Sequence, residues 1–103
     1  MKKKEKLFVY GTLKDARVQR NVFFREIKDG VPTTIHGYKI EELTLGGVIY
    51  PALVPHKKGI VEGILLTITP LELKLIDHYE TSAYKRESIL LDNDIHCWVY
   101  LKN

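Results

Sequence analysis

An apolar run that stops at a glycine, Leu7-Phe8-Val9-Tyr10-Gly11, constrains the fold of this chain more than any other feature. Aromatic and β-branched side chains suit a pleated and mostly buried surface, so residues 7–10 are predicted to form a strand. Gly11 ends that strand, because glycine adopts backbone angles that are closed to other residues. Residues 14–24 contain neither glycine nor proline and are predicted to form a helix. The chain is therefore expected to turn at Gly11 from a strand into a helix.

A turn of this kind has chemical consequences. The first N–H groups of a helix have no partner within the helix, and at such a turn they point into one small space. Unpaired N–H groups and the helix dipole both favour negative charge. Residues Tyr10, Gly11, Thr12 and Leu13 are therefore a candidate carboxylate or phosphate site. The alternative is that the turn only changes the direction of the chain, as most turns of this type do.

The composition is that of an ordinary folded protein. The chain has 103 residues, of which 45% are hydrophobic and 28% charged, and we expect a single domain over residues 1–103. A domain of this size buries roughly two-thirds of its unfolded surface. The formal net charge is only +3, and Lys2, Lys3 and Lys4 are three of the sixteen basic residues. We interpret these lysines as a solvated terminal tail, and the alternative is an arm that contacts nucleic acid.

A single cysteine and four scattered histidines give no metal-ligand pattern. Cys97 is the only cysteine, which excludes an internal disulfide and a thiol cluster, and it is expected to be a small buried hydrophobe. No metal-ligand spacing relates the histidines, which are His36, His56, His78 and His96. The apolar run after Lys6 is four residues long, too short for a signal-peptide core or a membrane span. We therefore expect a cytoplasmic protein without membrane association.

The middle of the chain is predicted to form short strands separated by turns. Two short strands are predicted within residues 36–45, before a tight turn at Gly46-Gly47. Pro51 lacks an N–H and cannot sit in a central ladder, so Tyr50-Pro51-Ala52-Leu53 is predicted to be an edge or a bend. Residues 56–59 are predicted to form a basic hairpin turn that leads into the longest strand, residues 60–68.

The clearest helix start is Thr69-Pro70-Leu71-Glu72, with a hydroxyl N-cap, a proline at the first helical position and a glutamate three residues after the cap. The helix is predicted to reach about Tyr79, with one apolar face made of Leu71, Leu75, Tyr79 and the adjacent Ile76. Glu80 then lies at its end. Two further strands are predicted at residues 89–91 and 95–101. Because both helices follow strands and strands predominate, the predicted class is α+β, a small curled sheet or barrel with helices packed against it.

Five motifs, in order along nearly the whole chain, resemble those of one family. The segment Phe8–Lys14 resembles the substrate loop of the γ-glutamylcyclotransferase-like (AIG2-like) superfamily, most closely its γ-glutamylamine cyclotransferase branch. The other four resembling segments are Tyr50-Pro51-Ala52-Leu53, Val61-Glu62-Gly63, Leu75-Ile76-Asp77-His78-Tyr79-Glu80 with Tyr84 and Arg86, and Cys97-Trp98-Val99-Tyr100. Each motif is short, but their combination in this order is specific.

The resemblance implies a small mixed β-barrel with flanking helices, one substrate pocket, and no metal or cofactor. It implies a reaction in which the α-amino group of a γ-glutamyl unit attacks its own γ-carbonyl, forming 5-oxoproline and releasing an amine or amino acid. Glu80 would be the proton acceptor. Residues Tyr10, Gly11, Thr12 and Leu13 would hold the γ-glutamyl group through the backbone. Tyr84 and Arg86 are candidates for shaping the pocket, and Asn21 and Tyr50 are further candidate lining residues.

The chemistry of Glu80 can be examined without the family. An α-ammonium is not a nucleophile, so a base must take its proton. An unshifted glutamate has a pKa near 4.3, and a gap of ~4 pKa units to the ammonium corresponds to ~5–6 kcal/mol. Burial beside Tyr79 and Ile76 would raise the pKa of Glu80 and close part of that gap. The amides of residues 11–13 are suitable donors either to the α-carboxylate of the substrate or to the oxyanion that forms.

Each of these residues also has a purely structural interpretation. Glu80 can be a solvated carboxylate at a helix end, and Tyr10 can be a core aromatic residue. Arg86 can be the ion-pair partner of a neighbouring carboxylate. Thr81 follows the glutamate where the family often has glycine, which leaves the substrate open.

Two other functional classes compete with the enzyme. The first is a protein of the same fold that binds a small carboxylate without chemistry. The second is a nucleic-acid binder, which is motivated only by the basic isoelectric point and the terminal lysines and lacks a clear basic stripe with exposed aromatic residues. We expect a small γ-glutamyl molecule as the partner and no nucleic acid. The sequence predicts no oligomeric state.

Overall fold

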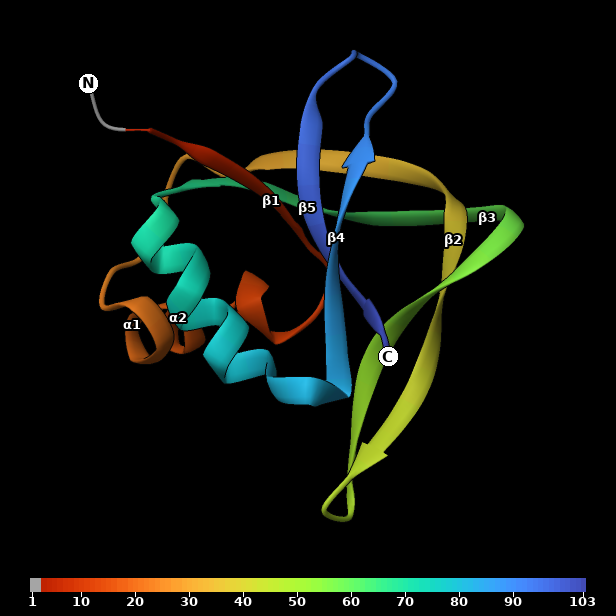
Figure 1. Ribbon diagram of the computed structural model, residues 1–103, viewed down its shortest axis with the longest axis horizontal. Coiled ribbons are helices and arrows are strands. Elements are labelled where there is room, and N and C mark those ends of the chain that lie inside the picture. Colours follow the sequence, from red (N-terminus) through yellow and green to blue (C-terminus); the bar gives the residue numbers. More distant parts are fainter. Residues whose placement is uncertain (1–2) are drawn as a thin grey trace.

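One long hairpin makes up most of the sheet (Figure 1). In the computed structural model, which describes residues 3–103, strands β2 (Val31–Leu45) and β3 (Val48–Ile68) pair antiparallel along most of their length. The predicted tight turn is confirmed: Gly46 and Gly47 connect the strands with φ angles of 57° and 81°. Two consecutive positive φ angles are what a type I′ hairpin turn requires, and glycine adopts them without strain.

Of the two alternatives predicted for residues 50–53, an edge or a bend, the structure shows the edge. The segment is continuous strand, and Pro51 pairs in register with Glu42. It is tolerated because β3 has only one neighbour there: its other partners pair with it at residues 64–68 and at Leu53. The predicted turn at residues 56–59 is instead a large bulge, since Pro55 pairs with Tyr38 and Ile60 with His36. The hairpin bends at this bulge instead of ending there.

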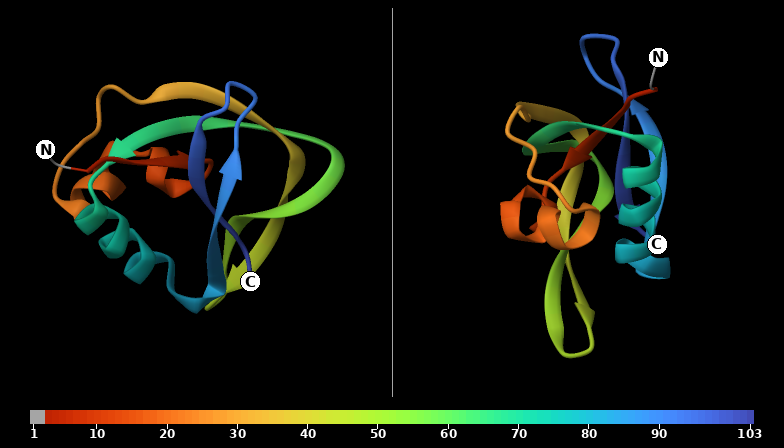
Figure 2. Two further views of the ribbon diagram at one scale, coloured as in Figure 1. Left: turned by 45° about the horizontal axis from the view of Figure 1, so that its top comes forward. Right: turned by 90° about the vertical axis from the view of Figure 1, so that its left-hand side faces the viewer.

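A closed ring of strand pairings curls the sheet. Strand β1 (Glu5–Val9) pairs antiparallel with β3 and parallel with β5 (His96–Lys102), and β3 also meets β5 at Leu53 and Leu101. Strand β4 (Tyr84–Leu90) begins before the predicted Ile89 and completes the order β2-β3-β1-β5-β4. The result is a mixed five-stranded half-barrel with helices at one end (Figure 2), which confirms the predicted α+β class.

The first helix is shorter than predicted. A single 3-10 turn, η1 (Thr12–Lys14), follows Gly11, and helix α1 (Ala16–Phe23) begins only after Asp15. Asp15 interrupts the helix because it takes an extended conformation and its side chain accepts the N–H of Arg17 at 2.7 Å. Phe23 is buried, and Val18 and Val22 pack against the core.

The second helix begins as predicted, and its buried face is partly the predicted one. Helix α2 (Pro70–Glu80) has the full capping box between Thr69 and Glu72. Ile76 is buried and Leu75 packs against the core as predicted, but Leu73 and Glu72 are also buried, whereas Leu71 is 66% exposed. The chain has apolar residues on two overlapping helical stripes, and packing against the sheet selects the stripe with Leu73 and Ile76.

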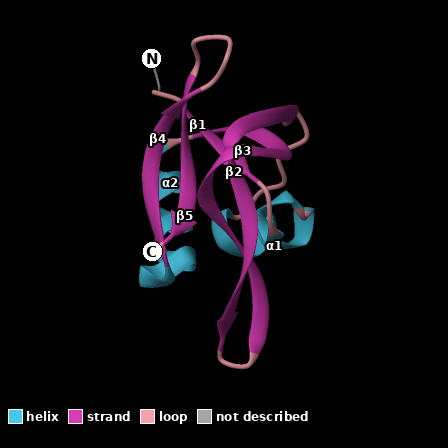
Figure 3. Ribbon diagram, turned by 90° about the vertical axis from the view of Figure 1, so that its right-hand side faces the viewer, coloured by secondary structure: helices cyan, strands magenta, loops and turns pink. Residues whose placement is uncertain are grey.

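The core lies in two clusters on the two sides of the sheet. One cluster joins both helices to β1 and β3, and the other fills the curl of the strands. Cys97 is buried in the second cluster, as predicted. Lys3 and Lys4 are exposed, as expected for a solvated tail, and Lys2 lies outside the described residues. None of the helices in the described part of the chain combines the length and apolar character needed to cross a membrane. Figure 3 shows the tip of the β2–β3 hairpin projecting beyond the rest of the molecule.

Candidate active site

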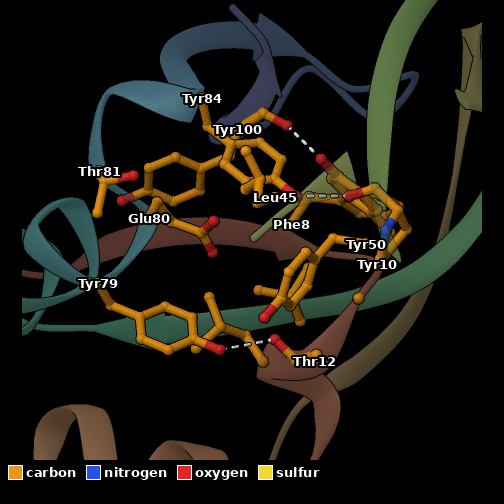
Figure 4. A pocket seen from close by; sticks show the side chains of 14 residues that line it. Phe8, Tyr10, Thr12, Leu45, Tyr50, Tyr79, Glu80, Thr81, Tyr84 and Tyr100 are labelled. Atoms are coloured by element: carbon orange, nitrogen blue, oxygen red, sulfur yellow. Dashed lines mark hydrogen bonds between the residues drawn. The ribbon is translucent and has the colours of Figure 1, made fainter. Parts of the chain in front are cut away.

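A cavity of about 240 Å³ opens where three distant segments meet (Figure 4). It is lined by residues 8–13, by the end of α2 with Thr81, by residues near the turn of the β2–β3 hairpin and by two tyrosines from β4 and β5. All six predicted site residues are among the lining residues, which include Glu80, Tyr10, Gly11, Thr12, Leu13 and Tyr84. The fold therefore brings the glycine turn and Glu80, at the end of α2, to the same cavity.

Glu80 is the last residue of α2 and points into this cavity (Figure 4). The helix stops there because Thr81 has a φ of 61°, outside the helical region. The carboxylate has no hydrogen-bond or ion-pair partner within residues 3–103, and burial raises the pKa of Glu80 from 4.5 to about 7. A carboxylate with this pKa gains and loses a proton near neutral pH, as a general base must.

The glycine turn supplies donors to the same cavity. The first backbone bonds of η1 run from the N–H groups of Lys14 and Asp15 to the carbonyls of Gly11 and Thr12. Within the described chain, the N–H groups of Gly11, Thr12 and Leu13 therefore have no protein acceptor. They are available to an anionic group of a ligand.

Two details of the turn differ from the sequence interpretation. Gly11 has a φ of −121°, so no left-handed backbone is required there. Glycine is favoured at this position by the limited space, since a Cβ would lie 3.0 Å from Cγ of Pro51. The turn also leads into a short 3-10 segment, so the N-terminus of an α-helix does not follow it directly. The preference of this turn for anions thus rests on its free amides alone.

The hydroxyl groups of the predicted tyrosines are already engaged. Tyr10 donates to the carbonyl of Tyr100 at 2.6 Å and accepts the N–H of Leu53 at 3.1 Å. Tyr84 donates to the carbonyl of Pro51 at 2.8 Å. Burial raises the pKa of both phenols, so they stay neutral. Their rings form the cavity wall, and Tyr10 is therefore both a structural residue and a lining residue.

Arg86 has the structural role that was the alternative. It donates two hydrogen bonds to Asp77, at 2.8 and 3.0 Å, and lies 4.2 Å from the ring centroid of Trp98. Tyr100 also donates its hydroxyl to Asp77. This cluster fixes the last turn of α2 to β4 and β5. Asn21 is exposed on α1 and is not among the lining residues, whereas Tyr50 is.

The structure adds lining residues that the sequence did not indicate. Tyr79 hydrogen-bonds with the hydroxyl of Thr12 at 3.0 Å across the mouth of the cavity. Tyr100 and Leu45 also line it. Tyr79 is the neighbour of Glu80 in the sequence, and this position could have indicated that it lines the site. Leu45 reaches the cavity only because the hairpin folds against the glycine turn.

The charge of the lining is simple. Glu80 is the one carboxylate among the lining residues, and none of them is lysine, arginine or histidine. No group of three or more His, Cys, Asp or Glu side chains within residues 3–103 is arranged to hold a metal ion. The arrangement can accept a cationic amine at Glu80 and hydrogen-bond an anion or carbonyl oxygen at the turn.

These features define a small-molecule site on an α+β half-barrel. The chain belongs to the "Gamma-glutamyl cyclotransferase, AIG2-like" family, whose model matches residues 7–103. Two relatives from Arabidopsis thaliana, AIG2-like proteins C and A, are each 34% identical to it over 84 residues, which is 81% of this chain. The chain spans about half the length of these curated relatives, 47% and 49% respectively.

Solved structures support the same fold. A solution structure of an Arabidopsis thaliana protein matches 97% of this chain and 62% of its own, with a TM-score of 0.80 and 28% identity. A structure titled "Gamma-glutamyl cyclotransferase" matches 98% of this chain and 68% of its own, with a TM-score of 0.75 and 12% identity. At that identity the second likeness shows the fold alone.

Proposed function

We propose that this protein is a cyclotransferase that converts γ-glutamyl amides into 5-oxoproline and a free amine. The observation that carries the proposal is the proximity of Glu80 to the turn. A carboxylate with a pKa of about 7 and three backbone amides, all without partners within residues 3–103, share one small cavity. A γ-glutamyl amide has a cationic α-ammonium for the acid and both a carboxylate and a carbonyl oxygen for the amides.

The reaction removes two protons from the α-ammonium nitrogen and needs no external nucleophile. Glu80 takes the first proton from the α-ammonium, and the free amine then attacks the γ-carbonyl carbon of the same molecule. The amides of residues 11–13 stabilise the oxyanion of the tetrahedral intermediate or hold the α-carboxylate. The protonated Glu80 gives its proton to the leaving nitrogen and then takes the second proton from the ring nitrogen. The C–N bond breaks, 5-oxoproline is formed, and Glu80 returns to its carboxylate form by passing this second proton to the amine, which leaves as an ammonium ion.

The raised pKa of Glu80 lowers the free-energy cost of this proton transfer. The α-ammonium of a γ-glutamyl unit has a pKa several units above 4.5, so an unshifted glutamate is a poor acceptor of its proton. Raising the pKa of Glu80 from 4.5 to about 7 narrows that gap by about 2.5 units, or ~3.4 kcal/mol. Because nucleophile and electrophile belong to one molecule, the cavity only has to fold the substrate into the ring-closing pose.

The charge of the cavity supports amides of simple amines as substrates. A γ-glutamyl amino acid carries a second carboxylate on its leaving group. The lining residues offer that carboxylate no lysine, arginine or histidine, and Glu80 repels it. A leaving group without an anion meets neither problem, so we propose γ-glutamyl amines as the preferred class.

The test is release of 5-oxoproline, measured by mass spectrometry, from γ-glutamyl methylamide and from γ-glutamyl dipeptides. Wild-type protein is expected to turn over the amide, and Glu80→Gln to lose at least ~100-fold in kcat/KM while staying folded. Glu87→Gln is the matched control, since Glu87 lies on β4 in an exposed pair with Lys85. Absence of 5-oxoproline from every γ-glutamyl compound would refute the proposal.

A further inference from the structure

The β2–β3 hairpin carries an apolar stripe that begins inside the cavity. Leu45 and Tyr50 line the cavity, and they pair across the hairpin with Val48 and Leu43, respectively. Directly paired residues share one face of an antiparallel ladder, as do residues two apart on a strand. These four residues, Leu43, Leu45, Val48 and Tyr50, therefore lie on one face and form what we call the hairpin stripe.

The hairpin stripe is exposed and uncharged. Leu45 is 38% and Val48 50% exposed, and the tip of the hairpin projects away from the body of the molecule (Figure 3). The next residue on this face is Glu41, which is held by Lys39 and Lys102 at 3.7 Å each. An exposed apolar surface that continues a ligand cavity is a feature of binding grooves.

The position of the stripe relative to Glu80 decides what it would touch. Glu80 and the turn amides take the γ-glutamyl half of the substrate, so the residues beside the hairpin turn are left for the leaving group. From Tyr50 to Val48 the stripe is about 7 Å long, roughly the length of a five- or six-carbon chain or a phenethyl group. Apart from Glu80, which is assigned to the γ-glutamyl half, no charged side chain is among the stripe residues or the cavity lining residues to bind the end of such a group.

We propose that the hairpin stripe binds an apolar tail on the leaving amine, so that γ-glutamyl conjugates of alkyl or arylalkyl amines are the preferred substrates. The inference rests on the proposed function for the identity of the γ-glutamyl half. Leu45, Val48 and Tyr50 are specificity-determining residues in this assignment.

The first experiment compares kcat/KM for γ-glutamyl hexylamide and γ-glutamyl methylamide. Each half-buried methylene is worth about twofold, so the hexyl-to-methyl ratio is expected to be roughly thirtyfold. The amide of 2-(2-aminoethoxy)ethanol, which has a polar tail of similar length, is expected to resemble the methylamide. A hexyl-to-methyl ratio near one, or equal rates for the polar and hexyl tails, would overturn the assignment.

Variants locate the effect on the stripe. Val48→Thr keeps the shape of the side chain and is expected to reduce the hexyl-to-methyl ratio ~threefold, and Leu45→Asn ~tenfold. Ile49→Thr is the matched control, because Ile49 is 61% exposed on the opposite face of the same hairpin. It should leave the ratio within about twofold of wild type. An equal loss in Ile49→Thr and Val48→Thr would contradict the proposal.

A binding measurement separates failure of this inference from failure of the proposed function. The monohexylamide and monomethylamide of glutaric acid lack the α-amino group and cannot cyclise. Their dissociation constants, measured by calorimetry, should show the same preference for hexyl and the same loss in Val48→Thr, even if no γ-glutamyl amide is turned over. No preference would overturn the stripe assignment. A ligand-free homodimer in sedimentation that Val48→Thr dissociates would also overturn it, because the stripe would then be a self-association surface.

Discussion

Burial of Glu80 has opposite effects on proton transfer and on stability. The same loss of hydration that raises the pKa to about 7 makes the charged form costly in the folded protein. The carboxylate has no compensating partner within the described residues, unlike Glu72, which is paired with Arg25. The protein thus retains a destabilising group at the position where the proposed reaction requires a base.

The first prediction concerns stability and pH. Folded Glu80 binds its proton up to a pH of about 7, and the unfolded chain only up to about 4.5, so the folded state holds more protons between these values. Stability is therefore lost as pH rises through this window. Glu80→Gln should be more stable than wild type at pH 8 by about 3 kcal/mol and similar to it below pH 4.5. Urea unfolding at the two pH values measures this, and Glu87→Gln should show no such difference.

The second prediction concerns the rate profile. Because Glu80 must be deprotonated to act, kcat/KM for a γ-glutamyl amide should rise with pH and reach half of its plateau near pH 7, the pKa of the buried group. A rise of kcat/KM centred near pH 4.5 instead would mean that the Glu80 carboxylate is solvated in the free enzyme. Initial rates from pH 4 to 9 with one substrate distinguish the two results.

At the scale of elements, the bulge in the long hairpin determines the shape of the site. Residues 56–59 have no partners opposite, and Gly37 on β2 has a φ of 89°. The bend places the start of β3 against the glycine turn while its end pairs with β1. Without this bend, one strand could not contribute both to the cavity wall and to the closed ring of pairings.

The third prediction tests the bulge. A Cβ on Gly59 would overlap the backbone carbonyl of Tyr38, which no rotamer change can relieve. Gly59→Ala should therefore lower the free energy of unfolding by about 2–3 kcal/mol or more. Lys58→Ala, at the neighbouring exposed position, should change it by less than about 0.5 kcal/mol. Equal midpoints of urea unfolding for the two variants would contradict this account of the bend.

At the scale of the whole molecule, one hydroxyl connects the parts that form the cavity. Tyr10 follows β1, donates to β5 at Tyr100 and accepts from β3 at Leu53. The ion pair between Asp77 and Arg86 likewise connects α2 to β4. The site is therefore a product of contacts between residues that are up to ninety positions apart in sequence.

The fourth prediction tests this connection. Tyr10→Phe removes the hydroxyl and leaves a buried N–H and a carbonyl without their partner, which should cost about 2 kcal/mol of unfolding free energy. Tyr38→Phe is the matched control, because the Tyr38 hydroxyl makes no hydrogen bond within residues 3–103 and should change stability by less than about 0.5 kcal/mol. Chemical denaturation of both variants measures these changes. Similar losses of unfolding free energy in the two variants would mean that the hydrogen bonds of the Tyr10 hydroxyl do not stabilise the fold.

Local chemistry made several features predictable from sequence. The capping box at Thr69, the glycine turn of the hairpin and the strand that ends just before the Gly11 turn depend on residues close together in the chain. The order of five short motifs predicted the family and class, and the family match and the structural likenesses confirm them. The predicted roles of Glu80 and residues 10–13 stay predictions, although the structure brings these residues together.

Tertiary packing decided the rest. Turn residues at 56–59 indicate a reversal locally, but the sheet uses them as a bulge because both sides of the bend are paired with β2. Two apolar stripes on α2 are equally helical, and only contact with the core selects Leu73 and Ile76. The burial that raises the pKa of Glu80, and the arrival of Leu45 beside it, require segments distant in sequence to meet. Sequence sets propensities between near neighbours, whereas desolvation and cavity shape depend on long-range contacts that exist only once the chain has folded.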